Sequence, residues 1–329
     1  MRIVHFQRRP LDSHFSIEQL FEAIRRHLPV EWQPEVAICP EYSRGLLPRI
    51  RNTRFARKQQ GDLNHITGDV HYIALGLPKA KTVLTIHDLG FLDHPRPLVR
   101  WVLKKAWLDW PLRKVRYVTT ISTASKMAIL KAAPFFPAER IRVIPNILPQ
   151  AIDAEPKAFN STYPRILLIG TKANKNLSNT LQALQGIPCQ VHLIGEYKPE
   201  VEALLKNNEL DYQYDSKVPY AAVLQAYRDC DLLLFASTFE GFGMPIIEAQ
   251  AMGRVVLTSK VSSMPEVAGR GACLVDPLNP EAIRAGLASV LQDESYRQAL
   301  IQAGFENVKR FEAAQIARQY VDLYQEILN

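Results

Sequence analysis

Residues 237–253 read S-T-F-E-G-F-G-M-P-I-I-E-A-Q-A-M-G, and this stretch decides the fold. It follows the apolar run L-L-L-F at 232–235, which predicts a buried parallel strand. Pro245 suits the first position of a helix, because its missing N–H would be unbonded there anyway. Strand, glycine-rich turn and helix N-terminus together form an anion site, since free backbone N–H groups and the helix dipole point to one place. Glu240 stands at the start of the turn, and Glu248 is expected in the first turn of the helix. A pair of carboxylates beside an anion site suits a ligand with phosphate at one end and hydroxyls at the other, such as a nucleotide sugar.

The composition is that of an ordinary folded protein. The chain has 329 residues, 47% of them hydrophobic and 22% charged, which is enough for two domains with cores of their own. The longest apolar runs are far shorter than a membrane-spanning helix. The opening M-R-I-V-H-F is too short in its apolar part for a signal peptide. The four cysteines are scattered without a C-x-x-C pair, which indicates reduced thiols in a cytoplasmic protein.

The net charge of +7 is unevenly distributed. Residues 1–150 contain 24 Lys and Arg against 12 Asp and Glu, whereas residues 151–329 contain 16 against 21. This asymmetry indicates that the first half meets something anionic, namely nucleic acid, a membrane surface or a phosphate-bearing acceptor. Residues 44–58 hold six basic side chains and no acidic one. They form either a solvated basic face or a patch that faces phosphate or membrane.

The spacing of the two glutamates carries a resemblance. Glu240 and Glu248 are separated by seven residues, and E-G-F-G-x-P-x-x-E-A-x-A-x-G resembles the E-x7-E signature of family 4 glycosyltransferases, which are retaining enzymes of the GT-B fold. The likeness continues in R-V-V-L-T-S at 254–259, P-E-V-A-G at 265–269 and V-D-P at 275–277. The resemblance implies an α/β protein with two Rossmann-like, doubly wound parallel-sheet domains that face a central cleft.

The strand–helix–strand opening of the chain also favours a parallel sheet. We expect an acceptor-binding N-terminal domain at 1–150 and a proline-containing linker at 151–164. A nucleotide-sugar-binding C-terminal domain would follow at 165–310. A terminal helix at 311–329 would cross back to the N-terminal domain, as the resemblance implies.

The resemblance assigns donor-binding roles in the second domain. Glu248 would hold the ribose hydroxyls, and Glu240 the hydroxyls of the donor sugar near the reacting centre. Four backbone N–H groups would meet the sugar and the phosphate, those of Gly241, Phe242, Gly243 and Met244.

Lys175 stands in T-K-A-N-K-N at the predicted start of a helix, where a lysine opposes the helix dipole. An anion shared between the ammonium group and the helix N-terminus would explain it, and the resemblance implies contact with the donor diphosphate. The arginine that often assists in the family is absent, since Asn174 precedes Lys175. Lys172, one turn away, is the candidate substitute.

His87 and Asp88 follow a predicted strand in T-I-H-D-L, and ligands of doubly wound sheets bind beyond the carboxyl ends of strands. By resemblance His87 lies close to the donor sugar. Asp88 is assigned either to capping of the turn or to contact with reacting groups.

Asp229 and Asp231 form a D-x-D, the metal motif of the other large glycosyltransferase fold. That motif belongs in a loop after a strand, whereas this one lies between a predicted helix and a predicted strand, so we expect it to end the helix and start the strand. No metal and no cofactor are expected; the nucleoside-diphosphate sugar is the donor substrate.

Trp101, Trp107 and Trp110 alternate with basic residues between 97 and 117. Such a helix can lie in a membrane interface. The alternative, which we favour, is a helix that covers the first sheet with its aromatic side chains and turns its lysines to water.

Together these features predict a retaining, metal-independent hexosyltransferase. It would move a sugar from a nucleoside-diphosphate sugar to a glycan or lipid-linked saccharide bound by the basic first half, in bacterial cell-surface polysaccharide or lipopolysaccharide synthesis. It would act in the cytoplasm, with the inner face of the cytoplasmic membrane as a candidate partner. Two alternatives stay open: a catalytically silent nucleotide-sugar-binding protein of the same fold, against which both glutamates argue, and a nucleic-acid-binding protein, for which no recognised motif appears.

Overall fold

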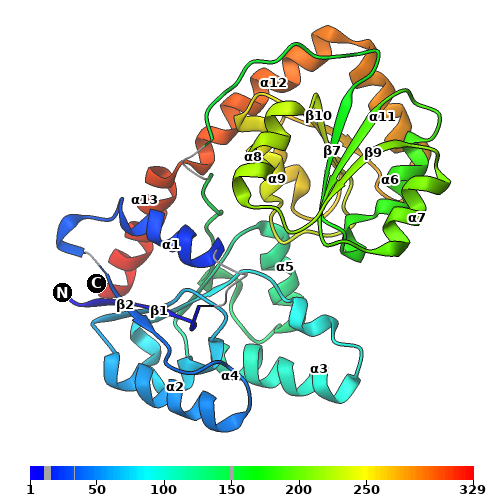
Figure 1. The fold of residues 1–329 in the computed structure, drawn as a ribbon. Coiled ribbons are helices and arrows are strands. Elements are labelled where there is room, and N and C mark those ends of the chain that lie inside the picture. The colour runs from blue at the N-terminus through cyan, green and yellow to red at the C-terminus, as the bar shows by residue number, and fades with distance from the viewer. Residues whose placement is uncertain (11–15, 33, 149–151) are drawn as a thin grey trace. The chain divides into compact units, whose positions relative to one another are not determined.

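The computed structural model describes residues 1–10, 16–32, 34–148 and 152–329, and it divides into two compact units (Figure 1). The first unit comprises residues 1–147 together with 312–329, and the second comprises residues 148–311. The C-terminal segment therefore belongs to the first unit. Residues 152–164, expected as a linker, belong to the second. No helix among the described residues is both long and apolar enough to cross a membrane.

The first unit is built on a six-stranded parallel sheet of order β2-β1-β3-β4-β5-β6. Its strands are β1 (Ile3–Gln7), β2 (Glu35–Ile38), β3 (Leu63–Ile66), β4 (Thr82–Ile86), β5 (Tyr117–Thr120) and β6 (Ile141–Val143). Its helices are α1 (Ser16–Arg25), α2 (Leu46–Gln59), α3 (Pro97–Leu103), α4 (Trp110–Leu112), α5 (Thr123–Ala132) and α13 (Ala313–Leu328), and a π-helical segment, η5 (Lys104–Asp109), joins α3 to α4.

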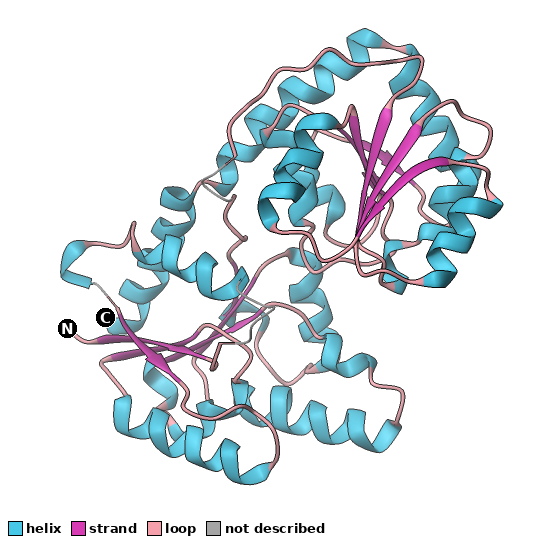
Figure 2. Ribbon diagram, viewed as in Figure 1, coloured by secondary structure: helices cyan, strands magenta, loops and turns pink. Residues whose placement is uncertain are grey.

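Both faces of this sheet are buried along its inner strands β1, β3, β4 and β5, because neighbouring residues of these strands enter different cores. In β1, Ile3 packs with α1 and α13, while Val4 and Phe6 pack with the face covered by α2, η5, α4 and α5. Helices accordingly lie on both sides of the strands in Figure 2. Ser122 caps α5, accepting a hydrogen bond from the backbone N–H of Ser125 at 3.0 Å.

A buried polar cluster ties the terminal helix α13 to this sheet. The Tyr324 hydroxyl lies 2.9 Å from Nε2 of His5 and 2.5 Å from Nδ1 of His65. Nε2 of His65 lies 2.7 Å from the Thr85 hydroxyl. Burial lowers the pKa of both imidazoles, that of His65 to about 3, so both are neutral at pH 7. Polar side chains from three strands thus hold the last helix of the chain on the first unit.

The second unit contains another six-stranded parallel sheet, of order β12-β11-β10-β7-β8-β9. Its strands are β7 (Arg165–Ile169), β8 (Gln190–Ile194), β9 (Asp211–Asp215), β10 (Leu232–Phe235), β11 (Val255–Ser259) and β12 (Cys273–Val275). Its helices are α6 (Leu177–Leu184), α7 (Pro199–Asn207), α8 (Tyr220–Asp229), α9 (Met244–Ala251), α10 (Met264–Ala268), α11 (Pro280–Gln292) and α12 (Glu294–Val308). The chain builds outward from β7 to β9 and then returns to place β10 on the other side of β7, so β7 and β10 flank a topological switch point.

The D-x-D pair has the structural role that its position predicts. Helix α8 ends at Asp229, and strand β10 begins one residue after Asp231. The buried Asp231 carboxylate accepts from the Lys157 ammonium at 2.6 Å and from the backbone N–H groups of Asn160 and Arg165 at 3.1 and 2.8 Å. Asp231 therefore joins the segment before β7 to the second unit, which explains why that segment is not a free linker.

Candidate active site

The candidate site of the second unit lies at the carboxyl ends of β7 and β10, the position where doubly wound sheets bind ligands. After β7 the chain makes a single 3₁₀ turn, η7 (Ala173–Lys175), before α6. After β10 it runs through 236–243 into α9. The two connections are hydrogen-bonded to each other: the backbone N–H of Thr238 donates to the carbonyl of Asn174 at 2.8 Å, and the Asn174 amide donates to the carbonyl of Phe239 at 2.9 Å.

Lys175 and Glu240 meet at this junction. The Lys175 ammonium donates to the Glu240 carboxylate at 2.7 Å, and the Asn174 amide donates to the same oxygen at 3.1 Å. The ammonium also lies 4.3 Å from the centre of the Phe235 ring, a cation–π distance. Both charged side chains are largely buried, so the pair is partly shielded from water. The sequence predicted Glu240 near the reacting centre and Lys175 on the donor diphosphate, but it did not predict this pair.

The Lys175 side chain lies against the backbone of Gly170, where no other residue would leave room for it. Gly170 has φ +95°, and a Cβ there would lie 2.7 Å from Cε of Lys175. Asn176 adopts the left-handed conformation, with φ 56°, and its amide donates to the carbonyls of Ala236 and Pro277. Helix α6 therefore begins at Leu177, and Lys175 ends the preceding turn instead of starting the helix. Lys172 is exposed and has no ion pair with another described residue.

Two serines donate hydrogen bonds to the backbone of the turn that follows Glu240. The Ser262 and Ser263 hydroxyls donate to the carbonyl of Glu240 at 2.8 and 2.9 Å, and Ser263 also lies 2.7 Å from the carbonyl of Phe242. The Phe242 ring is buried edge-on against Phe311, so only its backbone is available to a ligand. Gly243, with φ +108°, leads into α9. Gly241 lies in this turn, and Met244 is the first residue of the helix.

Glu248 is buried in the second turn of α9, whereas the sequence analysis expected the first turn. Its two carboxylate oxygens accept hydrogen bonds from the hydroxyls of Tyr220 at 3.0 Å and Tyr227 at 2.8 Å. Burial raises the pKa of Glu248, although the two hydroxyls act in the opposite direction. Sequence reasoning missed both tyrosines. They are seven residues apart in α8, so they lie on one face of the helix, and this spacing in the sequence could have indicated that they act together.

His87 and Asp88 belong to the first unit and follow β4. Nε2 of His87 lies 3.1 Å from the carbonyl of Thr67, which follows the neighbouring strand β3. Burial lowers the pKa of His87, so the imidazole is neutral at pH 7. The Asp88 carboxylate accepts from the backbone N–H of Gly90 at 2.9 Å, which is the capping interaction proposed as one of its two roles.

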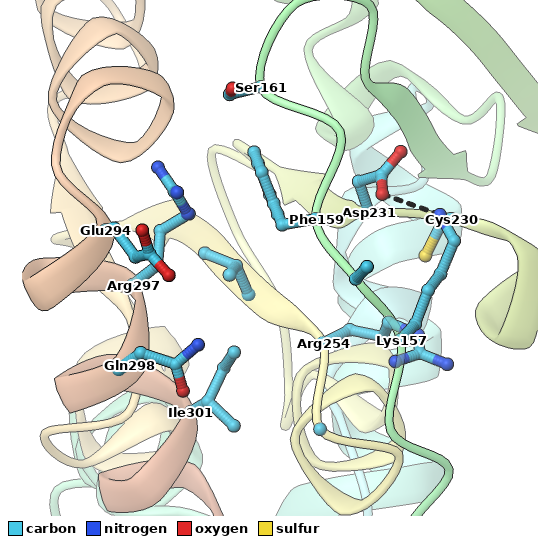
Figure 3. Close-up of a pocket in the computed structure, with 13 residues that line it drawn as sticks. Lys157, Phe159, Ser161, Cys230, Asp231, Arg254, Glu294, Arg297, Gln298 and Ile301 are labelled. Atoms are coloured by element: carbon cyan, nitrogen blue, oxygen red, sulfur yellow. Dashed lines mark hydrogen bonds and ion pairs between the residues drawn. The ribbon is translucent and has the colours of Figure 1, made fainter.

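A pocket of about 320 Å³ lies elsewhere in the second unit, near the amino ends of β10 and β11 (Figure 3). Its basic side chains already have partners. Lys157 pairs with Asp231, Arg254 donates to the carbonyls of Tyr227 and Arg228 at the end of α8, and Arg297 donates to the last carbonyls of α11. These contacts cap helices and bury an ion pair, so this pocket is a feature of packing, opposite in the sheet to the candidate site.

Comparison with known proteins agrees with this geometry. A family model described as Glycosyltransferase Family 4 matches residues 9–149, and one described as Glycosyl transferases group 1 matches residues 150–307. The O-antigen chain mannosyltransferase B of Escherichia coli is 28% identical over 277 residues, which cover 74% of this chain and 70% of that protein.

Two solved structures share the fold over nearly the whole chain. The sucrose-phosphate synthase of Thermosynechococcus elongatus has a TM-score of 0.77 at 17% identity, covering 99% of this chain and 98% of that one. Anabaena HepE, solved in complex with UDP and glucose, has a TM-score of 0.76 at 15% identity and covers 99% of both chains. Two matching family models, two parallel sheets and this fold lead to one conclusion: the chain belongs to the GT-B glycosyltransferases that the family 4 and group 1 models describe.

Proposed function

We propose that this glycosyltransferase is a retaining hexosyltransferase. It moves a hexose from a nucleoside-diphosphate sugar to a glycan or lipid-linked saccharide, in the synthesis of a bacterial cell-surface polysaccharide at the inner face of the cytoplasmic membrane. Mannose is the first sugar to test, because the Escherichia coli relative is an O-antigen mannosyltransferase by name. The observation that carries the proposal is the meeting of Lys175 and Glu240 at the switch point of the second sheet.

The site residues divide the work in the following way. Glu248 takes the ribose hydroxyls, and the turn from Gly241 to Met244 offers backbone N–H groups to the sugar and the phosphates. Lys175 exchanges part of its contact with Glu240 for the diphosphate and stabilises the negative charge that develops on it. The acceptor oxygen approaches the anomeric carbon from the same face that the departing phosphate leaves, and it bonds to that carbon as the bond from the carbon to the phosphate oxygen breaks, so the configuration is retained. The acceptor proton passes to the departing phosphate, and the nucleoside diphosphate leaves.

Thermal unfolding against a panel of UDP-, GDP- and ADP-sugars tests the donor site. A ligand that binds only the folded protein raises the free energy of unfolding by mass action, by about 2.7 kcal/mol when its concentration is a hundred times Kd. The melting temperature rises as a result. We expect one base class to raise the melting temperature of the wild type and to raise that of Glu248→Gln much less. A panel without any response, repeated in the presence of acceptor glycans, would shift the assignment to a protein that does not use nucleotide sugars.

The proposal includes two further statements that can be measured: the product retains the anomeric configuration of the donor, and transfer does not require a metal ion. Asp231, the residue of the D-x-D that directly precedes β10, already accepts hydrogen bonds from Lys157 and from backbone N–H groups. This supports a mechanism without a metal bound to the D-x-D. We expect unchanged transfer rates in excess EDTA, and NMR of the product showing the anomeric configuration of the donor. An inverted product, or activity that EDTA abolishes and Mg²⁺ or Mn²⁺ restores, would contradict it.

A further inference from the structure

The first unit exposes apolar side chains on two of its helices, on the outer side of each. In α3, Leu98, Trp101 and Val102 are 74%, 57% and 47% exposed and stand at i, i+3 and i+4, so they form one stripe. At the start of α2, Leu46 and Leu47 are 71% and 67% exposed. An outward apolar stripe reverses the usual arrangement of a surface helix, and large exposed apolar patches mark interaction surfaces.

The two helices cover the same face of the first sheet, and α2 contacts η5, the segment that continues α3. The Arg49 guanidinium of α2 lies 4.4 Å from the centre of the Trp107 ring in η5. Trp107 is buried, and it meets the expectation of an aromatic side chain facing the sheet. Trp101 and Trp110 do not, since both are exposed. Of the three tryptophans, Trp107 therefore packs in the core of the first unit, whereas Trp101 and Trp110 are left exposed on its surface.

The same two helices also carry exposed cations. The α2 sequence, L-L-P-R-I-R-N-T-R-F-A-R-K-Q, contains no acidic residue. Within the described part of the chain, four exposed cations of the two helices have no ion pair with a carboxylate: Arg54, Arg57, Lys58 and Arg100. Asp109, the acidic residue of η5, is buried and already paired with Lys104 and Lys105 at 2.7 Å. This surface, which we call the α2–α3 face, combines exposed tryptophan and leucine with unneutralised positive charge.

We infer that the α2–α3 face docks on an anionic lipid bilayer. Tryptophan and leucine insert at the boundary between headgroups and acyl chains, while arginine and lysine meet the lipid phosphates. A second copy of the chain is a poor occupant, because a symmetric contact would bring the cations of both copies together. Nucleic acid would satisfy the cations and leave the leucines in water. The inference deepens the proposed function, on which its link to a lipid-linked acceptor rests.

Co-sedimentation of the full chain with vesicles tests the inference. We expect binding to vesicles of equal parts phosphatidylglycerol and phosphatidylcholine, and little binding to phosphatidylcholine alone. The double variant Leu98→Ser, Trp101→Ser is expected to weaken binding on the order of tenfold, and so is Arg54→Gln, Arg57→Gln. Control variants change an exposed apolar side chain and two exposed basic side chains elsewhere on the first unit. Val30→Ser replaces a side chain that is 80% exposed, and Lys79→Gln, Arg140→Gln removes two exposed charges; both should bind like the wild type.

Tryptophan fluorescence gives an independent readout of insertion. Anionic vesicles should shift the emission to the blue, and lipids brominated on the acyl chain should quench it, with much less quenching in Trp101→Ser. Equal binding by all variants, binding to DNA without binding to vesicles, or a dimer that dissociates in Leu98→Ser, Trp101→Ser would each overturn the inference. The donor panel separates the two proposals, since a protein that binds a sugar nucleotide but no vesicle keeps the proposed function and loses only this surface.

Discussion

Replacing Lys175 with alanine is expected to lower the turnover number for sugar transfer by about 10²–10³-fold, the usual cost of removing one preorganised charge from a reacting centre. The ammonium is held at 2.7 Å from Glu240 and over the Phe235 ring in a largely buried position, so it is oriented before the donor arrives. Neutralisation of the diphosphate strengthens as the bond to the sugar breaks. The loss should therefore fall mainly on kcat and only partly on KM.

Steady-state kinetics with the donor identified by thermal unfolding measures this effect. Lys172→Ala is the comparison, because Lys172, the candidate substitute for the assisting arginine, is an exposed lysine three residues earlier without an ion pair to a described residue. It should change the rate far less than Lys175→Ala does. The melting temperature of both variants must stay near the wild-type value, since Asn174 still holds the Glu240 carboxylate when Lys175 is shortened. Equal rates for Lys175→Ala and the wild type would remove Lys175 from the reacting centre.

Replacing Glu248 with glutamine is expected to weaken binding of the nucleotide sugar roughly ten- to a hundredfold, the equivalent of one hydrogen bond to a charged group. Glutamine is nearly the same size and can still meet the hydroxyls of Tyr220 and Tyr227, so the fold is preserved. Tyr220→Phe is the control. It leaves the carboxylate in place and frees one of its oxygens, and it should bind the donor at least as well as the wild type does. Isothermal titration of the three proteins decides between these outcomes.

The pH dependence of Glu248 adds a second readout. Burial raises the pKa of Glu248 in the folded state, so the folded protein holds this proton more tightly than the unfolded chain does. Its contribution to stability is fully present below the ordinary carboxyl pKa and is lost as pH rises through the raised value. Donor binding, which needs the carboxylate, should strengthen over the same rise. Glu248→Gln should abolish both trends; persistence of either one in the variant would assign it to another group.

Most of the fold could be predicted from local sequence. The apolar run before the glycine-rich turn became β10, and Pro245, predicted at the first position of a helix, is the second residue of α9. Such features depend on side-chain periodicity, on glycine and proline conformations and on hydrogen bonds across a few residues. The same reasoning correctly placed Asp229 at a helix end and Asp231 before a strand, since the elements around them are strongly patterned.

The outward side of a helix was harder to predict. For the segment 97–117 the favoured prediction was that the aromatic side chains face the sheet. The structure buries Trp107 but exposes Trp101 and Trp110. Periodicity gives the angle between these residues around the helix. It does not say which of several apolar sides the sheet will cover, because that choice depends on α2 and η5 packing against each other.

By itself the sequence determined two parallel-sheet units, a glycine-rich turn at a helix N-terminus and a pair of glutamates separated by seven residues. Only the tertiary structure decided which groups those glutamates touch. Glu240 meets Lys175, 65 residues away, because the strand order places β10 beside β7, and Glu248 meets two tyrosines of α8. Local patterns specify elements within a few residues, whereas contacts between distant residues follow from the order in which strands pair, and that order forms only when the whole sheet buries both of its faces.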